Sequence, residues 1–193
     1  RFEAAGIDEV VFLEFTPAFA ALEPLQFVTQ VLRDGIGTRE LFVGEHFAFG
    51  KGRAGRIADL LEFGAQFGFR VHPMPPVTMD GEIVSSTRIR QMIQAGELQK
   101  AVRFLGRPYG IEGTVIAGAG RGTDLGWPTA NLRLPEGRVI PPDGVYAARV
   151  LWNGRRLDSA VYIGTRPTFG AGERLLEVSI LDERLELYGE KIR

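Results

Sequence analysis

The chain has 193 residues, a formal net charge of −1 at pH 7 and no cysteine. This length suffices for one large domain or two small ones. The near-zero charge excludes a globally basic protein that would attract nucleic acid or an anionic membrane, so anionic ligands would need local basic clusters. The missing cysteines exclude disulfides and thiolate metal sites, and they fit an expected cytoplasmic location. We expect neither a membrane span nor a signal peptide, because no apolar run approaches ~20 residues.

The first third of the chain alternates between strand and helix patterns. A β-branched and aromatic run is typical of a buried strand, and apolar residues at helical spacing between a proline and a glycine are typical of a helix. The predicted elements are a strand at Glu9–Phe15, a helix from Pro24 to Gly35, a strand at Leu41–Val43, a helix through Ile57–Phe67 and a strand at Phe69–Val71. This order predicts an α/β domain with a parallel sheet and right-handed crossovers.

A basic, glycine-rich loop runs from Gly44 to Arg56, after the second predicted strand. It lies at the carboxyl end of that strand, where open α/β sheets bind ligands. Its glycines beside Lys51 and Arg53 would suit phosphate groups. A solvated basic loop with no ligand is the alternative.

The hexapeptide Ser85–Arg90 opens the next predicted helix. Its hydroxyls are good N-caps. The free N–H groups of a helix start, with Arg88 and Arg90 beside them, form a ready anion site. Plain capping with two surface arginines explains the same residues. Gly96 ends this helix, and a second short helix ends at Gly106.

Helical patterns stop near Arg107, and short strands with turn signals follow. Asn153-Gly154 between two of these strands is a strong signal for a type I′ hairpin. The candidate strands are Ile111–Ile116, Ala130–Leu134, Gly144–Trp152, Arg155–Ile163 and Leu175–Leu181. Short antiparallel strands in this number predict a small barrel or sandwich. We therefore expect two domains, residues 1–106 and residues 107–193.

The segment Gly118–Asn131 reads G-A-G-R-G-T-D-L-G-W-P-T-A-N. Its glycines let the backbone bend tightly and approach a ligand, and successive N–H groups in such a loop bind anions. Thr129 and Asn131 add a hydroxyl and an amide oxygen, which suit Mg²⁺. The pattern predicts a nucleoside triphosphate site, and a glycine-rich turn before an edge strand is the alternative.

Glu177 stands in the predicted strand Leu175–Leu181, whose even-numbered residues are apolar. Because side chains alternate along a strand, Glu177 lies on the face opposite to those apolar residues. A carboxylate beside a phosphate site can accept a hydroxyl proton during group transfer. Glu177 is therefore a candidate general base, and a solvated strand residue is the alternative.

Several motifs occur in the order of one family across nearly the whole chain. They are Val43–Arg53, Val84–Arg90, Gly118–Leu132, Pro142–Ala147, Ile163–Gly170, Leu176–Asp182 and Leu187–Gly189. Together they resemble the bacterial bifunctional riboflavin kinase/FMN adenylyltransferase, also called FAD synthetase. The resemblance implies a partial Rossmann-like nucleotidyltransferase domain followed by a small antiparallel β-barrel of the flavokinase type.

The barrel would transfer the ATP γ-phosphate to the 5′-hydroxyl of riboflavin and give FMN. By resemblance, Thr129 contacts ATP and holds Mg²⁺ with Asn131, and Glu177 orients and deprotonates the ribityl hydroxyl. The residues that would line the ATP phosphate loop are Gly118, Gly120 and Gly122. Phosphoryl transfer depends mainly on positioning and charge neutralisation, so this set of groups suffices.

The first domain resembles the nucleotidyltransferase that joins FMN and ATP into FAD. Ser86, Thr87 and Arg90 match its ATP-phosphate motif. His46 lies in its nucleotide-binding loop, where the family usually has Asp or Asn. The family's H-x-G-H motif does not occur in this sequence. We therefore expect that this chain alone does not adenylylate FMN, even if its parent does.

Smaller departures concern the barrel. Ser179 replaces a frequent His, Glu183 replaces a usual aromatic residue, and the family continues past Gly189 into a strand and a helix that help to hold the flavin. Both ends of the chain thus look cut, and the alternative function is a non-catalytic module that binds flavin or adenine nucleotides. A nucleic-acid-binding barrel is disfavoured, because the second half lacks a basic stripe with exposed aromatics.

Overall fold

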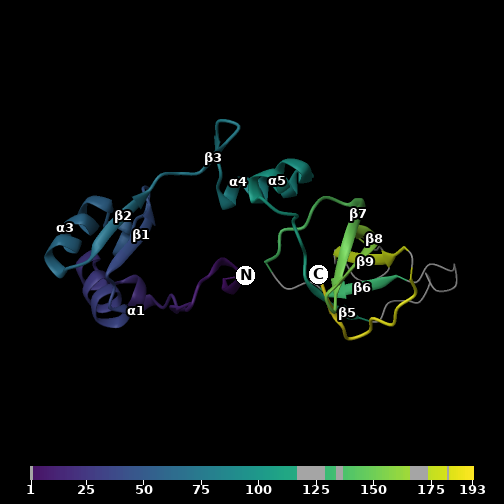
Figure 1. The fold of residues 1–193 in the computed structure, drawn as a ribbon, viewed down its shortest axis with the longest axis horizontal. Helices are drawn as coiled ribbons and strands as arrows, with labels where there is room; N and C mark the ends of the chain where they lie inside the picture. The colour runs from purple at the N-terminus through teal and green to yellow at the C-terminus, as the bar shows by residue number, and fades with distance from the viewer. Residues whose placement is uncertain (1, 117–128, 134–136, 166–173, 182) are drawn as a thin grey trace. The chain divides into compact units, whose positions relative to one another are not determined.

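The computed structural model describes residues 2–116, 129–133, 137–165, 174–181 and 183–193 (Figure 1). The chain forms two compact units, Arg1–Thr78 and Met79–Arg193. The two helices that precede Arg107 group with the second unit. The domain limits of 1–106 and 107–193 stay a prediction.

The helices of the first unit begin at the caps and prolines of the sequence. α1 (Pro17–Ala20) begins after the cap residue Thr16. α2 (Pro24–Phe27) begins at a proline and continues as a π-helix over Val28–Ile36. The helix ends at Gly37, whose φ of 70° is a left-handed conformation that favours glycine. This confirms the helix predicted from Pro24.

The sheet of the first unit has two parallel strands, β1 (Glu40–Gly44) and β2 (Arg70–Met74), with α3 (Ile57–Phe67) between them in the chain. One face of the sheet packs on the core of this unit. The buried core residues are Val28, Leu32, Phe49, Leu60 and Phe69, and the sheet residues packed against them are Leu41, Val43 and Val71. Both strands, the intervening helix and the parallel pairing confirm the prediction.

The strand predicted at Glu9–Phe15 is wrong. Residues 7–16 have no regular secondary structure, and Phe12 is 87% exposed. A strand is stabilised by hydrogen bonds to a neighbouring strand and by burial of its side chains. In the described part of the chain β1 and β2 pair only with each other, so residues 9–15 receive neither contribution.

The second unit begins with a small hairpin and two helices. β3 (Thr78–Met79) pairs with β4 (Glu82–Ile83), and α4 (Ser86–Gln94) and α5 (Leu98–Leu105) follow. The hydroxyl of Ser85 accepts a hydrogen bond from the backbone N–H of Arg88 at 3.3 Å, which confirms the predicted N-cap.

The two helices pack on the segment that leads into the barrel. Their buried residues are Met92, Ile93, Ala101 and Phe104, and Tyr109 and Val139 pack against them. The Tyr109 hydroxyl donates to the carbonyl oxygen of Val139 at 2.5 Å. Burial raises the pKa of this phenol.

A six-stranded antiparallel sheet forms the rest of the second unit. Its strands are β5 (Gly113–Ile116), β6 (Ala130–Arg133), β7 (Gly144–Trp152), β8 (Arg155–Thr165), β9 (Arg174–Ile180) and β10 (Lys191–Ile192), in the order β10-β5-β6-β9-β8-β7. The turn between β7 and β8 has φ values of 46° at Asn153 and 77° at Gly154, as a type I′ hairpin requires. The five strands predicted in this half correspond to β5, β6, β7, β8 and β9, so these predictions are confirmed.

The two edges of this sheet meet. Beyond β10, Arg193 exchanges two backbone hydrogen bonds with Leu151 of β7, at 2.7 and 3.2 Å. The sheet curls around one apolar core, made of Val115, Leu132, Val150, Leu157, Ile163, Leu176, Val178, Leu187 and Ile192. This arrangement confirms the small antiparallel barrel.

Candidate functional site

A polar pair lies on the two strands at the centre of the barrel sheet. Asn131 of β6 and Glu177 of β9 are direct register partners, so their side chains leave the same face. Asn131 is 5% exposed and Glu177 is half-buried. Their neighbours Leu132 and Leu176 point into the core on the opposite face. The face predicted for Glu177 is therefore confirmed.

Thr129 precedes β6 directly and is exposed. One residue, Ala130, separates it from Asn131, so three predicted site residues lie close together at the start of β6, beside β9. The predicted phosphate-loop residues Gly118, Gly120 and Gly122 lie outside the described residues. Their role stays a prediction.

The donor set at this place suits a hard cation. A threonine hydroxyl, an asparagine amide and a glutamate carboxylate all offer oxygen, which Mg²⁺ prefers. Mg²⁺ is usually held by one or two protein groups together with substrate phosphates and water. A set this small therefore fits, although the described residues contain no group of three or more His, Cys, Asp or Glu able to hold a metal ion.

The same row of the sheet contains a residue that the motif search did not single out. Tyr162 of β8 is the register partner of Glu177 on its other side, and Val145 of β7 is the partner of Tyr162. Tyr162 is 44% exposed. The strand alternation that placed Glu177 also predicts this neighbour, once the pairing of β8 with β9 is known.

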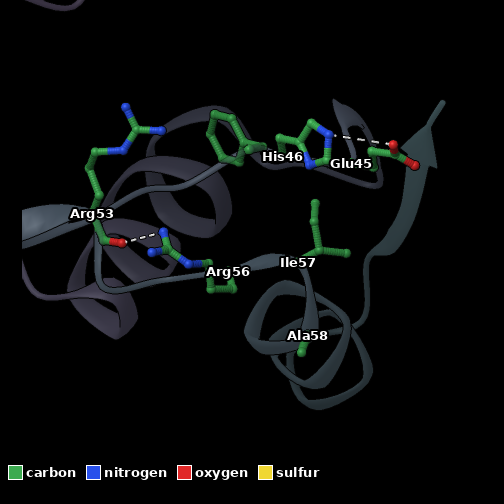
Figure 2. A pocket seen from close by; sticks show the side chains of 7 residues that line it. Glu45, His46, Arg53, Arg56, Ile57 and Ala58 are labelled. Carbon is green, nitrogen blue, oxygen red and sulfur yellow. Dashed lines mark hydrogen bonds and ion pairs between the residues drawn. The ribbon is translucent and has the colours of Figure 1, made fainter. Parts of the chain in front are cut away.

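The basic loop of the first unit borders a hollow of about 440 Å³. It is lined by Glu45, His46, Phe47, Arg53, Arg56, Ile57 and Ala58. Figure 2 shows His46 beside Glu45, with the two arginines on the adjoining stretch of chain. The His46 imidazole Nε2 lies 3.6 Å from the Glu45 carboxylate, and the His46 side chain is 83% exposed.

The two arginines of this loop differ in what they bind. Arg56 is engaged within the loop: its guanidinium donates to the carbonyl oxygen of Arg53 at 2.6 Å, and its backbone N–H donates to Asp59 at 2.7 Å. The Arg53 guanidinium makes no hydrogen bond or ion pair with another described residue. The guanidinium N–H groups of Arg53 can therefore donate hydrogen bonds to an anion in this hollow.

Two glycines of the loop have packing roles. A Cβ on Gly55 would lie 2.6 Å from the ring of Phe49, and a Cβ on Gly50 would lie 2.8 Å from Pro24. The Phe49 ring also stacks on Phe47, with centroids 5.9 Å apart. These glycines are therefore needed for close packing whether or not a phosphate binds, which the composition of the loop did not reveal.

The start of α4 carries the other predicted nucleotide residues. Ser86 and Thr87 are exposed in its first turn, and Arg90 follows, exposed and with no hydrogen bond or ion pair from its guanidinium to another described residue. Arg88 instead forms an ion pair with Glu82, which also accepts from Lys100 at 3.2 Å. His46 belongs to the first unit and the other three predicted residues to the second.

Comparisons with known proteins match two families in succession along the chain. Residues 1–88 match the FAD synthetase family, and residues 105–193 match the riboflavin kinase family. The chain is 39% identical over 188 residues to the bifunctional riboflavin kinase/FMN adenylyltransferase of Pseudomonas fluorescens. It is 37% identical over 189 residues to the protein of that name from Escherichia coli (strain K12).

The chain is similar to this bifunctional family along nearly its whole length. The two alignments cover 97% of the chain and 60% of each relative, so the chain spans about three fifths of the length of the curated relatives it matches. The resemblance drawn from the motifs is therefore confirmed. It extends across both units, because a matched family covers most of each.

A solved structure, described as a macrolide-efflux protein from Streptococcus pneumoniae, has the same fold. It superposes with a TM-score of 0.88 at 31% identity and covers 99% of this chain and 61% of that one. The efflux description belongs to that protein. Among the helices described in this chain, none has the length and apolar character needed to cross a membrane.

Proposed function

We propose that the intact protein makes FMN from riboflavin and ATP and then joins FMN and ATP into FAD. The second unit would be the kinase, and the basic loop with the start of α4 would serve the adenylyltransferase. The observation that carries the kinase assignment is the register pairing of Asn131 with Glu177 on one face, next to Thr129. We also propose that the protein acts in the cytoplasm on these small molecules.

The kinase chemistry follows from the positions of these groups. The Glu177 carboxylate orients the riboflavin 5′-hydroxyl and accepts its proton as that oxygen attacks the γ-phosphorus of ATP. The bond from the γ-phosphorus to the bridging oxygen breaks, and ADP leaves. Thr129 and Asn131 would hold Mg²⁺, which supplies charge neutralisation at the phosphates when bound. Because Asn131 is buried, its amide is held in place by the surrounding barrel.

The test uses the full-length protein. Glu177→Gln removes the proton acceptor and keeps the shape, so we expect FMN formation to fall by about 10²–10⁴-fold. Thr129→Ala should raise the Mg²⁺ concentration needed for half-maximal rate. Glu186→Gln, at an exposed carboxylate of the same unit, is the matched control and should keep the parental rate. FMN formation at parental rates in both site variants would show that the assigned roles are wrong.

The adenylyltransferase half has its own readout. Arg90→Ala and Arg53→Ala each remove a cation that has no described partner, so FAD formation should fall while FMN formation stays at the parental level. A loss of both activities together would contradict the assignment of these arginines to one reaction.

A second candidate function concerns the 193-residue chain by itself. Its first unit has a sheet of only two described strands and an unpaired apolar segment at residues 9–15, which favours binding without FAD synthesis. Titration with ADP–Mg²⁺ and with FMN separates the possibilities. Binding without turnover supports a non-catalytic module, and turnover contradicts it.

A further inference from the structure

Three register partners on one face of the barrel sheet form a row that crosses three neighbouring strands. Across the sheet the register partners run from Asn131 on β6 to Glu177 on β9 and to Tyr162 on β8. Neighbouring strands lie about 4.8 Å apart, so Asn131 and Tyr162 flank Glu177 at similar distances on opposite sides. Glu177 is thus the centre of the row, with an amide on one flank and an aromatic ring on the other.

The geometry of phosphoryl transfer assigns different roles to the two sides of Glu177, one with Asn131 and one with Tyr162. The attacking and leaving oxygens lie roughly in line through the transferred phosphorus, so donor and acceptor approach from opposite sides. Thr129 and Asn131 occupy the flank assigned to the metal and the ATP phosphates. The flank that contains Tyr162 is therefore left for the acceptor alcohol.

We infer that Tyr162 is a substrate-orienting residue, whose ring stacks on the planar ring system of the acceptor while Glu177 receives its hydroxyl. This inference rests on the proposed kinase function. Aromatic rings favour offset or edge contacts with other rings, and an exposed tyrosine offers such a surface at a small entropic cost. Val145, the next residue in the row, is 74% exposed and extends the apolar surface.

The structure fixes the orientation of the Tyr162 ring through Gly164. Gly164 lies two residues further along β8 and therefore on the same face. The Tyr162 ring and hydroxyl lie over Gly164, at a place where a Cβ would collide with them. Among the described residues, the three atoms nearest to that position all belong to Tyr162. Because Gly164 has no side chain, the Tyr162 ring can lie over it and is directed along the strand.

The first test separates acceptor binding from the other steps in the full-length protein. Tyr162→Ala should raise the KM for riboflavin about five- to tenfold while the KM for ATP stays within about twofold. Tyr162→Phe keeps the ring and should stay close to the parental values. Tyr188→Ala, at a tyrosine of the same unit that is 58% exposed, is the matched control and should change neither KM.

A double-mutant cycle with Gly164 gives an independent test. Gly164→Ala should displace the ring and raise the riboflavin KM as Tyr162→Ala does. In the Tyr162→Ala background the same change should add nothing, because the three described atoms nearest to the new Cβ all belong to Tyr162. Additive effects of the two substitutions would overturn the inference, and so would parental riboflavin KM values in Tyr162→Ala. A parent that forms no FMN would instead refute the proposed function, which distinguishes the two failures.

Discussion

The sheet of the second unit closes on itself, whereas the sheet of the first unit leaves one face open. In the second unit Arg193 and Leu151 join the two edges, and a single apolar core fills the interior. In the first unit only one face of the β1–β2 sheet packs on the core. Phe42, on the opposite face, is 62% exposed. The same chain therefore contains a self-contained fold and a partly covered one.

The open face shows what a parallel sheet ordinarily requires. Parallel strands are usually buried on both faces, because crossover helices lie on each side. Here the open face presents Phe42 stacked on His72, with centroids 4.4 Å apart and planes within 13°. The unpaired apolar segment at residues 9–15 belongs to the same unit. The comparison indicates that segments with similar patterns of apolar residues stabilise the two units to different extents.

The largest expected effect is in the barrel core. Leu176 is 4% exposed and packs in the centre of the sheet, so Leu176→Ala should lower the free energy of unfolding of the second unit by about 2–5 kcal/mol. Leu181→Ala, at a leucine just beyond β9 that is 50% exposed, is the matched control. Denaturant unfolding of both variants measures the difference. Equal losses would contradict the single closed core.

A smaller effect is expected in the basic loop. Gly55→Ala places a methyl group 2.6 Å from the Phe49 ring, so it should destabilise the first unit by about 1–3 kcal/mol through overpacking. Gly44→Ala is the control, because nothing lies within 4 Å of its added Cβ. Hydrogen exchange in α3 reports on this unit alone. An unchanged exchange rate in Gly55→Ala would leave only a ligand-binding role for this glycine.

Most elements were predictable because their signals are local. Pro24, the Ser85 cap and the Asn153-Gly154 turn each specify an element boundary through the chemistry of a few neighbouring residues. The Glu9–Phe15 strand failed because pairing depends on residues far away in the sequence. Its composition is typical of a strand, and no described strand pairs with it.

The candidate site shows the same limit. Alternation alone placed Glu177 on the correct face, and motifs singled out Asn131. Their direct pairing could not be predicted, because it joins β6 to β9 and two strands, β7 and β8, lie between them in the sequence. Tyr162 was missed because β8 and β9 follow each other in the chain, but the sequence pattern does not give the register that places Tyr162 opposite Glu177. The packing roles of Gly50 and Gly55 were missed because they depend on Pro24 and Phe49, which the pattern of the loop does not contain.

A weak electrostatic effect is expected where β5 and β10 meet. Lys191 lies 2.6 Å from the Glu112 carboxylate and lowers its pKa by hydrogen bonding. Because the folded pKa is depressed, the stabilisation is present above the usual pKa of glutamate, about 4.3, and is lost as the pH falls through the folded value. Glu112→Gln should thus cost about 0.5 kcal/mol at pH 7, since solvent screens this exposed pair.

The pH series supplies the control for that prediction. Unfolding of the parent and of Glu112→Gln should converge as the pH falls through the lowered pKa of folded Glu112, because below it Glu112 is protonated in both folded and unfolded protein. Glu186→Gln, at an exposed glutamate of the same unit, is the matched control. A Glu112→Gln deficit that stays constant down to the lowest pH at which the parent remains folded would show that the loss arises from packing.

The smallest expected effect is at the unpaired segment of the first unit. Phe12 is 87% exposed, so Phe12→Ser removes little buried apolar surface and should change the free energy of unfolding by less than about 0.5 kcal/mol. Phe69→Ser is the contrasting variant, because Phe69 is 5% exposed in the core of the same unit. Chymotrypsin should also cut near Phe12 before it cuts at Tyr146 in β7, because backbone without secondary structure is cleaved first. If Phe12→Ser instead costs more than about 1 kcal/mol, the segment is buried in solution. The two units would then be equally enclosed, and the contrast between them would not hold.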